Sequence, residues 1–294
     1  MMVDYRNVNP KIIFDSYPMP TIDQAFEQLD GAVVFSVFDL NSAYYQIPLS
    51  VSSRRVTAFG SPFGLYEFNS LPMGISVGSQ GLSRVIDELF ADLKGRSVFN
   101  FLDDLVVYSP SMEEHADHVR EVLQRLQDAG FTLNPEKVTF AANEIKYLGH
   151  LVSSRGIKVL PDRVATIRSY PRPPNLRTLR RFLGMVGFYA RFIQDFSGRA
   201  APLHCLRRKG VPFLWGEENQ KAFEDLRQAL CEAPVLQPPN FSRDFVLVTD
   251  ASNLAISAVL HQRVGGELAP SRTTVASSRR PSGDFPPMKR NALL

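Results

Sequence analysis

Two adjacent aspartates interrupt an apolar run, Val98-Phe99-Asn100-Phe101-Leu102-Asp103-Asp104-Leu105-Val106-Val107-Tyr108. The run predicts two strands with the acids at the turn between them. A buried carboxylate without a partner is strongly unfavourable, so such charges are normally compensated by cations or metal ions. An isolated Asp-Asp pair is also a common polar turn between strands. This run alone leaves both interpretations open.

A third aspartate ends a similar run upstream, Val33-Val34-Phe35-Ser36-Val37-Phe38-Asp39-Leu40. Two apolar strands that deliver carboxylates to one point would form a site for a divalent metal ion. Carboxylate oxygens are hard ligands, which favour Mg²⁺ or Mn²⁺. A carboxylate site with two such ions suits in-line phosphoryl or nucleotidyl transfer.

The composition sets broad limits on the class of protein. The chain has 294 residues, 44% of them apolar and 21% charged, which indicates a globular protein with room for two or three domains. The net charge of +3 permits a nucleic-acid partner without requiring one. The two cysteines, Cys205 and Cys231, give no disulfide framework and favour a reducing compartment. We expect no membrane span and no signal peptide.

Helical spacing is clearest in the range 111–129. Ser111 and Glu114 fit a capping box, and Gly130 is placed to end the helix. His115 and His118 lie on this helix. We expect them to be exposed on its surface, because no Cys or third His nearby has the spacing of a metal ligand.

The range 160–235 is predicted to be mainly helical. A leucine-rich stripe runs through 176–186 and is flanked by Arg177, Arg180 and Arg181. These arginines form either a solvated basic face or a contact surface for phosphates. Phe188, Tyr189 and Phe192 follow, and their spacing favours core positions over base stacking. A second helix is predicted over 217–232.

The last part of the chain begins with two predicted strands, 245–248 and 255–261, the second followed by the turn signal Gly265-Gly266. From Ala269 the chain is rich in Ser, Arg, Thr and Pro and has little periodicity, and we expect the range 263–294 to pack poorly. Its polar run 271–284 is not expected to bury enough area to offset its ordering entropy.

Short segments in a fixed order carry a resemblance to a known family. They are Val3-Asp4-Tyr5-Arg6-Asn7-Val8-Asn9, Tyr17-Pro18-Met19-Pro20, Phe35 to Ile47, Thr57-Ala58-Phe59 with Pro62 to Phe68, Leu71-Pro72-Met73-Gly74, Phe101-Leu102-Asp103-Asp104, Tyr147-Leu148-Gly149-His150, and Phe182-Leu183-Gly184 through Phe192. Together they resemble the reverse transcriptase region of a gypsy-type long-terminal-repeat retrotransposon Pol polyprotein, similar to that of retroviruses.

The resemblance implies an α+β fold, the right-hand polymerase, followed by a truncated RNase H-like fragment. The implied boundaries are 1–155 for fingers and palm, 156–240 for thumb and connection, and 241–294 for the partial RNase H-like domain. The implied partners are an RNA or DNA template with its primer, deoxynucleoside triphosphates and the remainder of a Pol polyprotein, with no membrane. The implied location is intracellular, in a cytoplasmic virus-like particle. Oligomeric state stays open.

The resemblance also implies roles for individual residues. Asp39, Asp103 and Asp104 correspond to the catalytic and metal-binding triad, which would hold two Mg²⁺ or Mn²⁺ ions. The nucleotide-binding positions are the Leu40 carbonyl, Tyr44, Gly74 and Lys137. The Tyr44 ring would exclude a 2′ hydroxyl, although an aromatic residue at this spacing is also a common core residue. Lys137 would stand near the triphosphate as a proton donor, although in isolation it would be an ordinary surface lysine.

Two of the family motifs, the Asp-Asp box and the second motif, depart from the usual pattern. Phe101 replaces the tyrosine that precedes the paired aspartates. Val77, Ser79 and Leu82 replace Asn, Pro and Phe, which leaves the helix on the nucleotide side in doubt. The chain begins after the point where the family has a triphosphate-binding arginine.

The C-terminal part departs further. Asp250 would be the first RNase H metal ligand, but Asn291 stands where the family has Glu. One carboxylate cannot hold two metal ions, so no RNase H activity is expected. Three hypotheses remain for the whole chain: an RNA-directed DNA polymerase domain, a catalytically inactive retroelement remnant, and a nucleic-acid-binding module.

Overall fold

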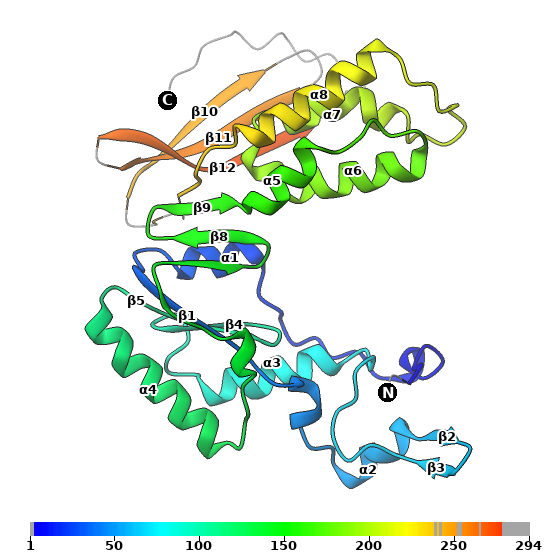
Figure 1. Cartoon of the computed structure of the whole chain (residues 1–294), viewed down its shortest axis with the longest axis vertical. Helices are drawn as coiled ribbons and strands as arrows, with labels where there is room; N and C mark the ends of the chain where they lie inside the picture. The colour runs from blue at the N-terminus through cyan, green and yellow to red at the C-terminus, as the bar shows by residue number, and fades with distance from the viewer. Residues whose placement is uncertain (1–2, 238–239, 241–242, 252–254, 265, 278–294) are drawn as a thin grey trace, which may run out of the picture. The chain divides into compact units, whose positions relative to one another are not determined.

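Helices and antiparallel strands alternate in both halves of the chain, as the computed structural model shows (Figure 1). It describes residues 3–237, 240, 243–251, 255–264 and 266–277. Contacts divide the chain into two units, Met1–Ile145 and Lys146–Leu294, here called unit 1 and unit 2. Among the described residues, no helix has the length and apolar character needed to cross a bilayer.

The described residues of unit 1 form a four-stranded sheet, a small hairpin, four α-helices and short 3₁₀ helices. In chain order its elements are η1 (Asn9–Lys11), α1 (Ile22–Gln28), β1 (Val34–Asp39), η2 (Ala43–Gln46), α2 (Val51–Arg54), η3 (Arg55–Thr57), β2 (Phe59–Ser61), β3 (Gly64–Tyr66), α3 (Gly78–Leu89), β4 (Val98–Phe101), β5 (Asp104–Ser109), α4 (Met112–Asp128), η4 (Pro135–Lys137) and β6 (Thr139–Ala142). Strand β7 (Glu144–Tyr147) continues from unit 1 into unit 2.

The four-stranded sheet has the order β4-β5-β1-β6, and we call it the palm sheet. Strand β1 pairs with β5 in an unbroken antiparallel register from Val34↔Ser109 to Asp39↔Asp104. Residues directly opposite each other in such a pair point to the same face. The register therefore assigns each side chain of β1 and β5 to one face of the sheet.

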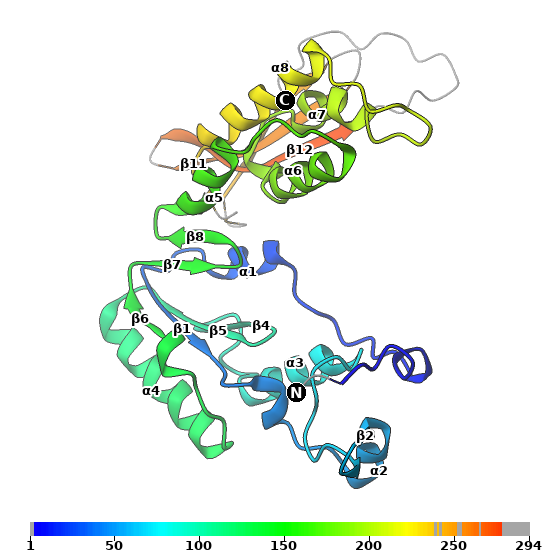
Figure 2. The ribbon, with the colours of Figure 1, turned by 45° about the vertical axis from the view of Figure 1, so that its right-hand side comes forward.

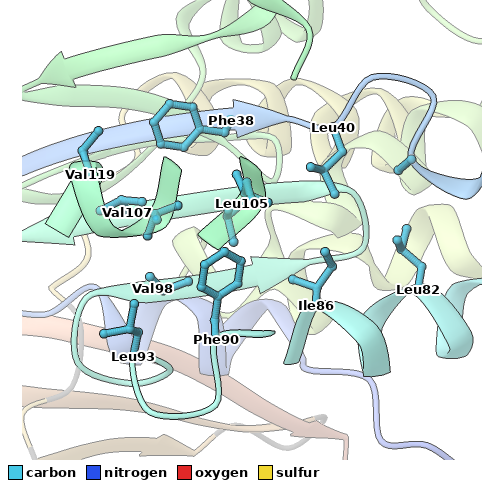
Figure 3. Close-up of a cluster of buried hydrophobic side chains, with 13 residues drawn as sticks. Phe38, Leu40, Leu82, Ile86, Phe90, Leu93, Val98, Leu105, Val107 and Val119 are labelled. Carbon is cyan, nitrogen blue, oxygen red and sulfur yellow. The ribbon is translucent and has the colours of Figure 1, made fainter. Parts of the chain in front are cut away.

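One face of the palm sheet packs against α3 and α4 (Figure 3). Phe38, Leu105 and Val107 supply the sheet side of this cluster, together with Val98 from β4. The helical side chains of the cluster are Leu82, Ile86, Val119, Val122 and Leu126, with Phe90 just beyond the end of α3. Burial of Leu82 shows that the substituted second motif still forms a packed helix.

Helix α4 confirms the predicted helix of the range 111–129, but its histidines are not on the surface. Ser111 Oγ accepts from Glu114 N at 3.2 Å, and Gly130 has φ of 75° just after the helix. His115 is buried at 1% exposure and His118 is half-buried, so the expectation that both are exposed is wrong. His115 lies one turn before Val119 on the stripe that faces the sheet, and its ring nitrogens find polar partners there.

These partners form a buried hydrogen-bonded chain between α4 and the palm sheet. His115 Nε2 lies 2.8 Å from Ser36 Oγ in β1, and His115 Nδ1 lies 2.9 Å from Ser109 Oγ at the end of β5. His118 Nδ1 is 2.8 Å from the same Ser109 oxygen. Ser36 Oγ also accepts from Ala141 N at 2.9 Å, where the β1–β6 register is irregular. The side chains of Ser36, Ser109 and His115 in this hydrogen-bonded network thus each have a polar partner.

Unit 2 contains a three-stranded hairpin sheet, a helical region and a second three-stranded sheet. After β7 its elements are β8 (His150–Ser153), β9 (Gly156–Val159), α5 (Pro161–Arg168), α6 (Leu176–Phe188), η5 (Ala190–Phe192), α7 (Phe196–Cys205), α8 (Glu217–Cys231), β10 (Phe245–Ala251), β11 (Ala255–Val264) and β12 (Glu267–Ser277). The sheets have the orders β7-β8-β9 and β10-β11-β12. Figure 2 gives a second view of these elements.

Helix α6 confirms the predicted leucine-rich stripe. Leu179, Phe182 and Val186 are fully buried, whereas Arg177, Arg180 and Arg181 are exposed. The basic face is thus open to solvent. Tyr189 and Phe192, which follow, are core residues as predicted, whereas Phe188 is 44% exposed.

Strand β12 contradicts the expectation for the range 263–277. It pairs with β11 from Ala255↔Ser277 to Val264↔Glu267 and contacts α7 and η5. Backbone pairing and the β-branched residues Thr273, Thr274 and Val275 favour a strand here, although the hydropathy pattern did not indicate one. The rest of the polar run, 278–284, lies outside the described residues.

Candidate active site

The paired aspartates lie at a two-residue hairpin turn between β4 and β5. Phe101 pairs with Asp104, so Leu102 and Asp103 form the loop. Leu102 has φ of 59°, in the left-handed region that residues other than Gly, Asn and Asp seldom adopt. Tight pairing on both sides holds this strained turn in place.

Asp39 lies next to this turn on the neighbouring strand. It is the last residue of β1 and stands directly opposite Asp104, so the two side chains share a face. Leu40 N donates to the Asp103 carbonyl at 3.5 Å, which brings Asp103 to the same strand end. Phe38 and Leu105, the neighbouring pair, point to the helix-covered face. Asp39 and Asp104 therefore point away from the hydrophobic cluster.

The three carboxylates interact electrostatically. Burial raises the pKa of Asp104, and the negative charges of Asp103 and Asp39 raise it further. All three residues are half-buried. A group of like charges at this depth is unfavourable unless a cation compensates it.

Lys137 supplies a positive charge at this position. Its Nζ donates to Asp39 Oδ2 at 3.0 Å, and its side chain is 62% exposed while that of Asp39 is 16% exposed. The hydrogen bond to Asp39 raises the pKa of Lys137, and the charges of Asp103 and Asp104 add to this effect. Two sequence-predicted site residues from different motifs are thus in direct contact.

The three aspartates have the type of ligand atom that a divalent metal ion requires. Asp39, Asp103 and Asp104 offer carboxylate oxygens, the ligands that Mg²⁺ and Mn²⁺ prefer. Among the described residues, no three Asp, Glu, His or Cys side chains already converge on one metal position. Asp39 instead accepts the hydrogen bond of Lys137. The residues are of the right type and on the right strand ends, but their side chains are arranged for the ammonium group.

Tyr44 stands close to the triad in sequence and packs against the start of α3. It lies in η2, is half-buried, and its hydroxyl is 3.0 Å from Ser79 Oγ. A Cβ built on Gly78 would lie 3.4 Å from the Tyr44 ring, so the ring contacts the helix closely. Two first-turn residues of α3 thus hold this ring in place.

Gly74 and Leu40 occupy turns beside these elements. Gly74 has φ of 96°, which favours glycine, and its carbonyl accepts from Asn9 Nδ2 at 2.9 Å. Leu40 is buried and forms a bridge with Leu133. Asp250 lies in unit 2, in β10 opposite Ser257, and Asn291 lies outside the described residues.

Two residues near the site were not singled out from the sequence. Ser79 was noted only as a departure from the family pattern, yet it contacts the Tyr44 hydroxyl. Asn134 was missed, although Asn-Pro is a turn signal that could have indicated it. Its backbone N donates to the Asp39 carbonyl at 2.9 Å, and its side chain caps η4 by accepting from Glu136 N at 3.2 Å.

Comparison with known proteins identifies the class to which this fold and site belong. Residues 1–152 match the family described as reverse transcriptase (RNA-dependent DNA polymerase). Residues 215–282 match an RNase H-like domain found in reverse transcriptase. The chain therefore belongs to the reverse transcriptase family.

Individual relatives give the same assignment. The chain is 36% identical over 272 residues to the retrovirus-related Pol polyprotein from transposon 412 of Drosophila melanogaster, covering 92% of this chain and 22% of the relative. It is 33% identical over 263 residues to the transposon Tf2-3 polyprotein of Schizosaccharomyces pombe, covering 90% and 20%. The chain thus spans about a fifth of the length of these relatives.

The fold matches a solved structure of the same class. A foamy viral protease-reverse transcriptase in complex with double-stranded DNA superposes with a TM-score of 0.85 at 21% identity, covering 94% of this chain and 49% of that one. The α+β right-hand polymerase fold with an RNase H-like region, expected from the resemblance, is confirmed.

Proposed function

We propose that this chain catalyses RNA-directed DNA synthesis by nucleotidyl transfer onto a primer 3′ hydroxyl. The observation that carries the proposal is the β1–β5 register, which sets Asp39 opposite Asp104 on one face of the palm sheet, with Asp103 in the adjoining turn. Membership of the reverse transcriptase family supports the same reaction class. No protein nucleophile is required, because the attacking oxygen belongs to the primer.

Asp39, Asp103 and Asp104 are the residues that would hold two Mg²⁺ or Mn²⁺ ions, with the Leu40 carbonyl as a further ligand. When bound, such ions lower the pKa of the attacking hydroxyl and stabilise charge on the transferred phosphate. The role of the protein is to hold the carboxylates. The strained Leu102 turn and the β1–β5 ladder do this by fixing the backbone on both sides.

Lys137, Tyr44 and Gly74 form the proposed nucleotide side of the site. The side chain of Lys137 is 62% exposed, and its ammonium group would donate a proton to the leaving pyrophosphate. The Tyr44 ring, fixed by Ser79 and Gly78, would meet the 2′ carbon of the incoming sugar and exclude a hydroxyl there. Gly74 allows the turn before α3 to pass close to the substrate.

Template-primer and deoxynucleoside triphosphates are the proposed partners, together with the remainder of a Pol polyprotein. The exposed arginines of α6, Arg177, Arg180 and Arg181, are candidates for contacts with backbone phosphates. The boundaries 1–155, 156–240 and 241–294 for fingers and palm, thumb and connection, and RNase H-like part also stay predictions. An intracellular location in a cytoplasmic virus-like particle is part of the same proposal.

Primer extension on poly(rA)/oligo(dT) with Mg²⁺ or Mn²⁺ tests the activity. We expect extension that is lost when the metal is chelated. A chain that binds template-primer with steep salt dependence but never extends it would be a nucleic-acid-binding module instead. A chain that does neither would be an inactive remnant.

A further inference from the structure

The turn that carries Lys137 is bound to the same strand end that carries Asp39. Asn134 N donates to the Asp39 carbonyl at 2.9 Å, and Asn41 N donates to the Thr132 carbonyl at 2.9 Å. Lys137 N in turn donates to the Asn134 carbonyl at 3.2 Å, which closes η4. Backbone hydrogen bonds thus place the base of the Lys137 side chain beside the carboxylates.

The contact of Lys137 with Asp39 is therefore more than an ion pair between two free surface side chains. Asp39 accepts hydrogen bonds from this turn at both its carbonyl and its carboxylate. Its side chain is 16% exposed and shares a face with that of Asp104, whereas the side chain of Lys137 is 62% exposed. The carboxylate is fixed, and the ammonium group can leave toward solvent.

We propose that Lys137 is an internal counter-cation of the Asp39–Asp103–Asp104 cluster, which a divalent metal ion must displace from Asp39 in order to bind. This inference rests on the metal site of the proposed function. A metal ion at Asp39 and the Lys137 ammonium group compete for the same carboxylate and repel each other. Metal binding and release of Lys137 are consequently one coupled equilibrium.

The coupling has a consequence for the order of events. Release from Asp39 leaves a positively charged, exposed side chain beside the site, which is where an anionic triphosphate would enter. Without the metal ion, the ammonium group compensates the carboxylates and keeps the cluster compatible with the fold. Lys137 is in this sense a positioning residue that acts through Asp39.

Mn²⁺ binding to the full chain, measured by titration calorimetry, tests the competition. We expect Lys137→Met to bind Mn²⁺ about tenfold more tightly than the wild type, since coupling between two sites commonly lies near this size. Lys137→Arg, which restores the cation, should return to within about threefold of the wild type. Lys137→Gln, a second neutral variant, should resemble Lys137→Met.

Lys146→Met is the matched control. Lys146 also pairs with an aspartate, Asp162, at 3.6 Å and is 69% exposed, but it lies in unit 2. Its removal should leave Mn²⁺ affinity within about twofold of the wild type, which separates the local competition from a general loss of positive charge.

Thermal unfolding provides a second readout by reciprocity. Lys137→Met should unfold at a lower temperature than the wild type without metal, and the difference should close at saturating Mn²⁺. Suppose that the wild type binds Mn²⁺ and extends primers. If Lys137→Met then binds Mn²⁺ with equal or weaker affinity, this inference is overturned and the proposed function is not. Absence of Mn²⁺ binding in every chain, with no primer extension, would overturn the proposed function as well.

Discussion

The palm sheet and the C-terminal sheet β10-β11-β12 are both antiparallel with long registers. They differ in how far their apolar side chains are buried. In the palm sheet Phe35, Phe99 and Val106 are completely buried. In β10, Leu247 is 57% exposed and Val248 is 47% exposed. The core strands of the palm sheet are thus packed on their apolar side chains, whereas β10 exposes two of its own, although β12 of the same sheet contacts α7 and η5.

The packing on the faces of a sheet influences whether acidic side chains can be held together at the end of its strands. Helices α3 and α4 bury one face of the palm sheet, and Phe35, Phe99 and Val106 on the other face are completely buried as well, so Asp39 and Asp104 stand at the strand end of a sheet that is packed on both faces. The apolar burial offsets the cost of gathering like charges. The C-terminal sheet has one acid of the expected kind, Asp250, and exposed apolar side chains on β10.

The largest expected effect is the loss of chemistry from the palm turn. Asp103→Asn should reduce primer extension by about 10³-fold or more, because it removes a proposed metal ligand without touching the basic surface. Template-primer affinity should stay within about twofold. Asp104→Asn should reduce primer extension less than Asp103→Asn does if Asp104 has the more peripheral role in metal binding. Full extension by Asp103→Asn, measured under single-turnover conditions, would show that the metal assignment is wrong.

The next effect concerns stability and separates the two sheets directly. Phe99→Ala should destabilise unit 1 by about 3–5 kcal/mol, since it empties a fully buried position. Leu247→Ala on β10 should cost less than about 1 kcal/mol, because that side chain is already more than half exposed. Urea unfolding of both variants gives the comparison. Similar losses in the two sheets would mean that the C-terminal sheet is covered in solution.

Sugar selection tests how firmly the palm holds Tyr44. Tyr44→Val should raise ribonucleotide incorporation relative to deoxyribonucleotide by about tenfold or more, because a steric clash is removed. Ser79→Ala should raise it about twofold to tenfold through loss of one hydrogen bond to the ring hydroxyl. The ratio of kcat/KM values is the measurement. Selectivity that is unchanged in an active Tyr44→Val enzyme would return Tyr44 to a purely structural role.

A smaller effect should appear on acidification. Burial lowers the pKa of His115, and the neighbouring His118 lowers it further. A lowered pKa in the folded state means that the stability contribution is complete above the ordinary histidine pKa of about 6.5 and is lost as pH falls through the folded value. The protection factors of β5 amides, which correct exchange rates for the intrinsic pH dependence of exchange, should therefore fall between about pH 7 and pH 5.

His115→Asn is the control for this pH dependence, because it keeps a polar side chain without the titration. Its β5 amides should show a flatter response over the same range. Burial also lowers the pKa of His204 in unit 2, so exchange must be resolved by region. An unchanged slope in the β5 amides of His115→Asn would exclude His115 as the titrating group.

The smallest expected effect is none at all. Asp250→Asn should leave primer extension unchanged, and neither this variant nor the wild type should cleave an RNA–DNA hybrid. Asp250 is the one described residue of this sheet that matches an RNase H metal ligand, and one carboxylate cannot hold two metal ions. Metal-dependent hybrid cleavage that is lost in Asp250→Asn would contradict the difference drawn between the sheets.

The sequence predicted the parts of the molecule that depend on local pattern. The strands around Asp39 and Asp103, and the helix α4, follow from apolar runs, turn residues and caps. The burial of His115 could not be predicted in this way, because the ring bonds to Ser36 and Ser109. Both serines lie outside helix α4, and only the folded sheet brings them to it.

Long-range pairing accounts for the other differences. The range 267–277 forms a strand because β11 offers an edge, a fact that hydropathy does not encode. The contact between Lys137 and Asp39 joins residues 98 positions apart in the chain. The family resemblance placed both near the substrate, but only the structure shows that each is the other's partner.

The unbroken register between β1 and β5 also has a genetic consequence. Many single substitutions along these strands change one contact and leave the rest of the ladder in place. Loss or gain of a single codon within Val34–Asp39 would move every following side chain to the opposite face. Asp39 would then point toward the buried cluster under α3 and α4 and away from Asp104. A three-nucleotide deletion in this strand is therefore expected to reorient a proposed metal ligand in one step, whereas most point mutations change a single side chain.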